Sequence, residues 1–187
     1  MKVTKPIRNK EDINKLKLYF IKRKEYRNYL LLIIGFNTAL RIIDILNLKF
    51  GDLYDYERGC FKNHITLREK KTGKYQEIYI NDVIRDAFKL YNGMKKCPDD
   101  YIFANKQGEP ISRVQAYRII KGASEDINIE PVSCHSLRKT FGYYAWKHGA
   151  EPALLMQVYN HSSYEITKRY LGITQDDKDK LFDEVRI

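Results

Sequence analysis

The sequence predicts a mostly α-helical fold with one small antiparallel β-sheet, in the α+β class. Apolar residues recur at helical spacing over most of the 187 residues, and a single alternating stretch lies between Phe61 and Ile80. Hydrophobic residues make up 43% and charged residues 31%, which is typical of a soluble globular protein. Since no repeat, Gly/Ser linker or low-complexity segment interrupts the chain, we expect one domain over residues 1–187.

The first third of the sequence predicts three helical segments. Residues 10–24 place apolar side chains on one stripe, and Asn9 precedes them as a candidate N-cap. Residues 26–38 are apolar on all sides, as a buried helix is, and residues 42–48 continue as a further helical segment.

The middle of the chain predicts a β-hairpin and two more helices. Residues 61–80 alternate between apolar and polar side chains on either side of a Thr72-Gly73 turn. Asn81 is positioned to cap the next helix, and Ser112 begins another because Gln115 follows at capping-box spacing.

The last third is predicted to be helical again. Residues 136–148 and 152–159 form two short helices separated by Gly149. Ser162 and Glu165 have the spacing of a capping box, so a new helix is expected to begin there.

Several classes of protein are excluded by composition. The longest apolar run, residues 29–36, is too short to span a membrane, and no signal sequence opens the chain, so we expect a cytoplasmic protein. Cys60, Cys97 and Cys134 are widely spaced and form no C-x-x-C pair, which predicts free thiols and neither a disulfide framework nor a zinc site.

The charge of the chain favours a partner that carries phosphates. Lys and Arg number 34 against 24 Asp and Glu, which leaves a net charge of +10. The excess is concentrated in residues 1–30, which hold ten basic and three acidic side chains. Charge alone does not distinguish a nucleic-acid surface from a solvated basic helix face.

Two cations occupy unusual places in the predicted elements. Arg41 lies in the strongly apolar segment 37–48, which we expect to be helical at this residue. A guanidinium there must be paired or point into a cleft, and Asp44 is an available partner. Lys71 lies at the tip of the predicted hairpin, where an exposed, mobile lysine is also the ordinary expectation.

Two histidines lie near groups that handle phosphate. His135 and Arg138 are three residues apart, so a helix would place them on one face where they could hold one phosphate. Taken alone, this tetrapeptide favours an ordinary helix start with a surface arginine. His161 precedes Tyr170 by nine residues, and the predicted capping box places the histidine in a loop and the tyrosine on the next helix. A half-buried aromatic is the alternative for Tyr170.

In their joint order and spacing, these residues resemble the catalytic domain of the tyrosine recombinase (phage integrase) family, over residues 26–182. Thr140 and Leu171-Gly172 also stand where that family often has them. The resemblance implies the family's catalytic-domain fold and a site-specific DNA recombinase, as in integration, excision or inversion of mobile DNA. It implies six catalytic residues: Arg41, Lys71, His135, Arg138, His161 and Tyr170.

The resemblance also implies a role for each group. Tyr170 is the nucleophile that forms a 3′-phosphotyrosyl link, and Arg41 and Arg138 neutralise the charge that develops on the phosphate. His135 accepts the phenol proton, and His161 donates a hydrogen bond to a non-bridging oxygen. Lys71 protonates the departing 5′ oxygen, and its neighbours Lys70 and Lys74 are the less favoured candidates for this role.

The chain departs from the family pattern at two positions. Lys139 stands where many members carry a second histidine, and Asn160 stands where glycine commonly precedes the histidine of this loop. Neither departure removes a reacting group. The resemblance implies a reaction without cofactor or metal. The sequence agrees with this, since it holds no phosphate-binding glycine loop of the Gly-x-x-x-x-Gly-Lys type and no evident carboxylate cluster for Mg²⁺.

The partners that the resemblance implies are double-stranded DNA, further copies of the chain in a tetrameric synaptic complex, and accessory DNA-bending proteins. Leu181, Phe182 and Val185 follow helical spacing in a charged tail, which either folds back on its own domain or packs on a neighbouring copy. The N-terminal core-binding domain of most members is expected to be absent. The alternatives are a type IB topoisomerase, which relaxes DNA without exchanging strands, a non-cutting DNA-binding regulator, and a basic structural protein with an accidental match.

Overall fold

The computed structural model describes residues 4–185, and it is mostly helical with two small antiparallel β-pairs. The predicted fold class is therefore confirmed. Its helices and strands are α1 (Lys10–Lys22), α2 (Tyr26–Asn37), α3 (Ile42–Leu46), α4 (Phe50–Leu53), β1 (Tyr54–Asp55), β2 (Cys60–Phe61), β3 (His64–Arg68), β4 (Tyr75–Tyr79), α5 (Asp82–Leu90), the 3₁₀ helix Gly93–Lys95, α6 (Arg113–Asp126), α7 (Cys134–Lys147), α8 (Pro152–Tyr159), α9 (Tyr164–Leu171) and α10 (Gln175–Glu184).

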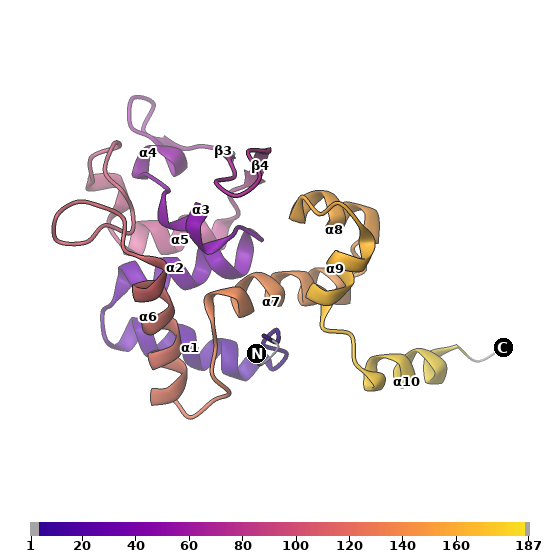
Figure 1. Cartoon of the computed structure of the whole chain (residues 1–187). Coiled ribbons are helices and arrows are strands. Elements are labelled where there is room, and N and C mark those ends of the chain that lie inside the picture. Colours follow the sequence, from indigo (N-terminus) through magenta and orange to yellow (C-terminus); the bar gives the residue numbers. More distant parts are fainter. Residues whose placement is uncertain (1–3, 186–187) are drawn as a thin grey trace.

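Helix α2 lies at the centre of the core. Its residues 30–34 are fully buried, and it packs against α1, α5 and α7, as its apolar surface on all sides predicted. Helix α7 leads away from this core to α8 and α9, which lie beside it, and α10 projects from the body beyond them (Figure 1). The site described below forms where α7, α8 and α9 meet.

The predicted hairpin is present as β3 and β4, which pair antiparallel with Arg68 opposite Tyr75. The amide of Glu69 donates to the carbonyl of Lys74 over 3.0 Å, and Gly73 provides the left-handed conformation (φ +66°) that closes the turn. Strands β1 and β2 form a second antiparallel pair, which the alternation over residues 61–80 did not predict.

Side-chain caps begin the helices at three of the predicted positions. Asn9 accepts a hydrogen bond from the amide of Glu11, and Asn81 and Ser112 each accept one from an amide three residues on. Each cap satisfies one of the amides that a helix start leaves without a partner.

Two predicted helix starts are wrong. Helix α7 begins at Cys134 instead of residue 136, because Ser133 caps it and exchanges hydrogen bonds with Ser136. Helix α9 begins at Tyr164, and its extended N-cap is Ser163, so the capping box predicted at Ser162 does not form. That shift places Glu165 at the second helical position, too close to the N-cap for the reciprocal bond of a capping box.

Within residues 4–185, no helix combines the length and apolar character that crossing a bilayer requires.

The contact between α2 and α7 gives a test of the packing. A Cβ added at Gly35 would lie 2.6 Å from Cδ1 of Leu137, whereas one added at Gly122 in α6 would meet nothing within 4 Å. We expect Gly35→Ala to lower the free energy of unfolding, measured by urea titration, by about 1–3 kcal/mol through overpacking. Gly122→Ala is the matched control and should raise it by about 0.5–1 kcal/mol. Equal effects at the two positions would contradict this account of the α2–α7 contact.

Candidate active site

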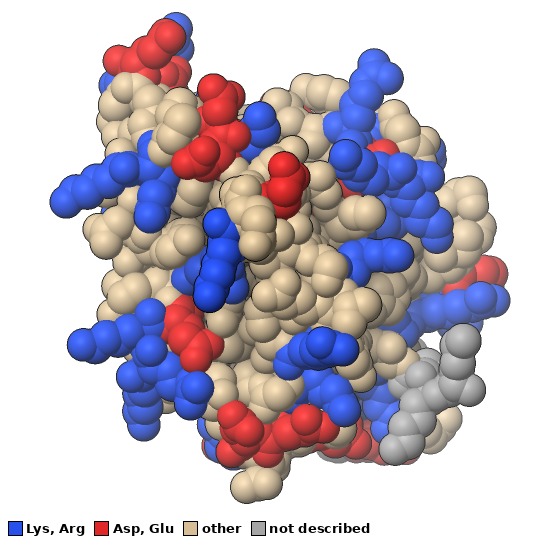
Figure 2. Space-filling view, turned by 60° about the vertical axis from the view of Figure 1, so that its left-hand side comes forward, with Lys and Arg blue, Asp and Glu red and all other residues tan. Residues whose placement is uncertain are grey.

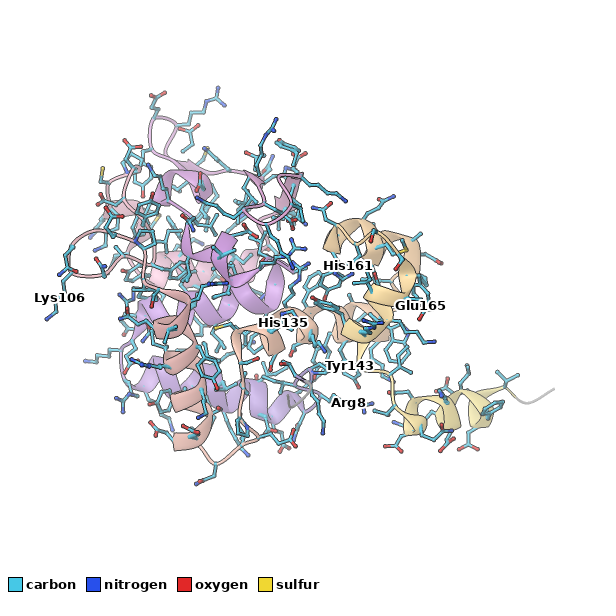
Figure 3. The ribbon with its side chains drawn as sticks, in the orientation of Figure 1. Arg8, Lys106, His135, Tyr143, His161 and Glu165 are labelled. Atoms are coloured by element: carbon cyan, nitrogen blue, oxygen red, sulfur yellow. The ribbon has the colours of Figure 1, made fainter. Side chains whose placement is uncertain are left out.

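Side chains from two segments, α7 and the loop before α9, converge on the ring of Tyr170 in α9. Its ring centroid lies 5.0 Å from that of His135 at the start of α7 and 4.7 Å from that of His161, in the loop before α9. The guanidinium carbon of Arg138 lies 5.7 Å from the same centroid. His135 and His161 are seen at this junction of α7 with the α8–α9 pair in Figure 3. Four of the six predicted site residues therefore lie together.

Arg138 is held deep in the site and is only 1% exposed, so it is not the surface arginine of the alternative interpretation. One terminal nitrogen donates a hydrogen bond to the carbonyl of Ala39, and the other donates to the carbonyl of Tyr159 over 3.0 Å. The hydroxyl of Tyr159 in turn donates to the carbonyl of Arg138 over 2.7 Å. These bonds fix the guanidinium while its Nε finds no partner among residues 4–185.

The predicted setting of Arg41 needs two corrections. It lies in the extended connection before α3, as the N-cap of that helix, and not within an apolar helix. Its ion-pair partner is Glu69, whose side chain is fully buried, and not Asp44. Asp44 instead accepts a hydrogen bond from the amide of Lys70 over 2.8 Å. Because both carboxylates hold the hairpin turn, they attach this turn to the segment that carries Arg41.

Lys71 lies exposed in this turn, at the position the sequence predicted. It lies near enough to His135 for its charge to contribute to a lower pKa of that histidine. The hairpin lysine is therefore brought towards the site while its side chain stays exposed.

Both histidines of the site have lowered pKa values. Desolvation by the surrounding protein, followed by the positive charges of Lys139 and Arg138, lowers the pKa of His135 to about 4, although the residue as a whole is exposed. Desolvation and then the charges of Arg138 and Arg41 lower the pKa of His161 to about 4. Each imidazole is therefore neutral near pH 7 and can accept a proton or donate one hydrogen bond.

Asn160 explains how His161 reaches the site. It ends α8 in the left-handed conformation, with φ at 53°, which reverses the chain directly before the histidine. Glycine adopts this conformation most readily and asparagine tolerates it well, so the departure from the family's glycine preserves the turn. The ring of His161 then stacks on that of Tyr159, with centroids 5.0 Å apart and planes at 11°.

Sequence reasoning missed Glu69, Tyr159 and the burial of Lys139. Lys139 is 7% exposed, donates to the carbonyl of Thr4 over 2.7 Å, and lies 5.6 Å from the Tyr170 ring centroid. Its place directly after Arg138 on α7 was the available signal. Glu69 was the single acid in a basic turn, and nothing in the sequence distinguished Tyr159 from the other tyrosines.

The neutral histidines should make stability depend on pH. A histidine with a pKa near 4 when folded and 6.5 when unfolded favours unfolding as it becomes protonated. Its contribution is complete above pH 6.5 and is lost as the pH falls towards 4. We expect urea titrations to show the unfolding free energy falling over this window, and falling less steeply in His135→Gln. A variant with the wild-type pH dependence would contradict the lowered pKa of His135.

Comparison with known proteins finds one matching family and relatives of similar sequence. Residues 9–176 match the sequence model of the family described as "Phage integrase family". The chain is 38% identical over 178 residues to the probable integrase/recombinase YoeC of Bacillus subtilis (strain 168), and the match covers 94% of this chain and 93% of YoeC.

Two solved structures share the fold. The crystal structure of XerA recombinase has a TM-score of 0.79 and 19% identity, covering 100% of this chain and 66% of XerA. The XerH site-specific recombinase, bound to palindromic difH substrate in a post-cleavage complex, has a TM-score of 0.76 and 21% identity, covering 94% of this chain and 51% of XerH. This chain therefore spans half to two thirds of the solved chains and nearly the whole of YoeC.

Proposed function

The chain belongs to the phage integrase family of tyrosine recombinases, and on that premise we propose which of its residues cut and rejoin DNA. The family, the fold class and the site-specific recombinase function predicted from the sequence are confirmed. The individual roles of the six site residues stay predictions. The observation that carries them is the convergence of His135, Arg138 and His161 on the ring of Tyr170.

The proposed reaction is a transesterification. The phenol oxygen of Tyr170 attacks the scissile phosphorus, forming a phosphotyrosyl bond as the bond from phosphorus to the 5′ oxygen breaks. Rejoining runs the step in reverse with a new 5′ hydroxyl as the attacking group. The phosphoester bond is exchanged and never hydrolysed, so the cycle needs no ATP.

Charge stabilisation comes from the two arginines. Negative charge grows on the non-bridging oxygens in the transition state, and Arg138 is already oriented beside the nucleophile by the carbonyls of Ala39 and Tyr159. Arg41 is close to the same site, since its positive charge and that of Arg138 both lower the pKa of His161. A neutral His161 adds one hydrogen bond to a non-bridging oxygen.

Two residues handle the protons. His135, with its pKa lowered to about 4, is deprotonated near pH 7 and can take the phenol proton of Tyr170. Lys71, in the hairpin turn, gives a proton to the departing 5′ oxygen. The attachment of this turn through Glu69 and Asp44 supports its role, because it holds an exposed loop beside the half-buried Arg41.

Double-stranded DNA is the proposed substrate. The net charge of +10 suits a polyanion, and Figure 2 shows a face on which Lys and Arg spread widely while Asp and Glu gather in a few places. XerH was solved on a difH substrate, which supports the same class of ligand here. Accessory DNA-bending proteins stay an expectation from the family resemblance.

The alternatives differ from this proposal in what happens after DNA is bound. A type IB topoisomerase would relax supercoils without joining two sites, and a non-cutting regulator would form no covalent adduct. The convergence of reacting groups on Tyr170 favours cutting over regulation, and the match to YoeC favours recombination over relaxation.

The first test is trapping of the covalent intermediate. Wild-type protein, incubated with supercoiled DNA that carries its native recombination site in EDTA and stopped with SDS, should yield a protein–DNA adduct. Tyr170→Phe should yield none while binding the same DNA, because only the phenol oxygen is removed. Tyr164→Phe, on the same helix, is the matched control and should keep the adduct. An adduct in Tyr170→Phe would refute the assigned nucleophile, and none in wild type would favour the non-cutting regulator.

Assembly on DNA is proposed to use α10. Asp177 anchors its first turn to the body by ion pairs of 2.8 Å to Arg8 and 2.9 Å to Lys147, and the pKa of Asp177 falls to about 2. Further along, Leu181 is 58% and Phe182 77% exposed. Exposed apolar side chains on a projecting helix are stabilised when another protein surface covers them. We therefore infer that α10 packs on a neighbouring copy in a synaptic tetramer.

Substitution of Phe182 tests this inference. Phe182→Ser should change the free energy of unfolding by less than about 0.5 kcal/mol, because the ring is already exposed. We expect it to reduce the yield of complexes that hold two DNA sites, measured by native gel or mass photometry, while single-site binding persists. Lys180→Ser on the same helix is the control. A loss of stability in Phe182→Ser would instead indicate that α10 packs on its own domain.

A further inference from the structure

His161 has a hydrogen-bond partner that no sequence pattern assigned. Its Nδ1 lies 3.0 Å from Oγ1 of Thr167, one turn into α9, and Thr167 is fully buried. The imidazole is also enclosed by aromatic rings, stacked on Tyr159 and 4.7 Å from Tyr170 between centroids. The ring of His161 is therefore held by stacking on Tyr159, by the tilted ring of Tyr170 and by a hydrogen bond at one of its two nitrogens.

The direction of this hydrogen bond can be inferred by comparing Thr167 with two other buried threonines. Thr38 and Thr140 each donate their hydroxyl hydrogen to the carbonyl four residues earlier, over 2.8 Å. Thr167 makes no such bond to Ser163, and within residues 4–185 its hydroxyl bonds only to Nδ1 of His161. A buried hydroxyl requires an acceptor for its hydrogen, so Thr167 donates and Nδ1 accepts.

The tautomer of His161 follows from that direction. A neutral imidazole carries one hydrogen, and a nitrogen that accepts a hydrogen bond does not hold it. The hydrogen is therefore on Nε2, the nitrogen on the opposite side of the ring from Thr167. Rotation of the ring by half a turn would break the bond to Thr167, so the same contact opposes the flipped orientation.

We propose that Thr167 is a positioning residue that holds His161 as its Nε2–H tautomer, in the orientation that donates a hydrogen bond to a non-bridging oxygen of the scissile phosphate. The catalytic part of this inference rests on the proposed function. The tautomer itself does not, because it is a property of the protein without DNA.

The first arm of the test reads the tautomer directly. In ¹⁵N-labelled wild-type protein near pH 7, without DNA, the NMR spectrum should show His161 with an unprotonated Nδ1 and a protonated Nε2. Thr167→Val keeps the volume of the side chain and removes the donor, so the Nδ1 resonance should move towards that of an imidazole without a hydrogen bond. A protonated Nδ1 in wild type, or an unmoved Nδ1 resonance in Thr167→Val, would overturn the proposal.

The second arm measures the single-turnover rate of phosphotyrosyl adduct formation on the native site. Thr167→Val should slow it by about tenfold, within the range of coupled neighbouring residues, with unchanged DNA affinity. Thr167→Ser retains the hydroxyl and should restore most of the rate. In a His161→Ala background, Thr167→Val should cause no further loss, because its effect passes through the imidazole. An equal tenfold loss in that background would indicate a structural role and overturn the proposal.

The two arms separate the possible failures. Wild-type protein with the expected tautomer but no adduct would refute the proposed function. An expected tautomer together with a Thr167→Val rate equal to that of wild type would refute the positioning role while the recombinase chemistry stood.

Discussion

The buried guanidinium of Arg138 is the feature on which the site depends. A charge so far from water is tolerated only where hydrogen bonds replace its hydration, and here the carbonyls of Ala39 and Tyr159 do so. Ala39 lies in the connection that follows α2 and Tyr159 ends α8, so one cation ties α7 to both segments. The chain then reverses at Asn160 and delivers His161 to the same place.

Clustered positive charge sets the chemistry of the neighbouring groups. Arg138 and Arg41 lie close enough that each opposes protonation of His161, and Lys139 does the same for His135. Glu69 compensates part of the charge of Arg41 and holds the hairpin turn. The cluster therefore combines neutral imidazoles with cations whose charge is only partly compensated, an arrangement that binding of an anion would stabilise.

The sequence was informative where short-range physics decides the structure. Alternation of side chains predicted the hairpin that carries Lys71, and the capping side chains of Asn9 and Asn81 are where the sequence placed them. Predictions from the sequence were wrong where several nearby residues could fill the same structural role. Ser162 and Ser163 are both plausible caps, and the backbone conformation of Ser163 decided between them. The partner of Arg41 was assigned to Asp44 because it is near in sequence, whereas Glu69 is near in space.

The order and spacing of the six polar residues determined, from sequence alone, the family and the reaction that this chain performs. Only the tertiary structure decided how those residues are held: the carbonyls that orient Arg138, the burial of Lys139, and the hydroxyl of Thr167 on the imidazole of His161. The reason is physical. Residue types limit which reactions are possible, but protonation state and orientation depend on desolvation and on contacts between segments far apart in the chain.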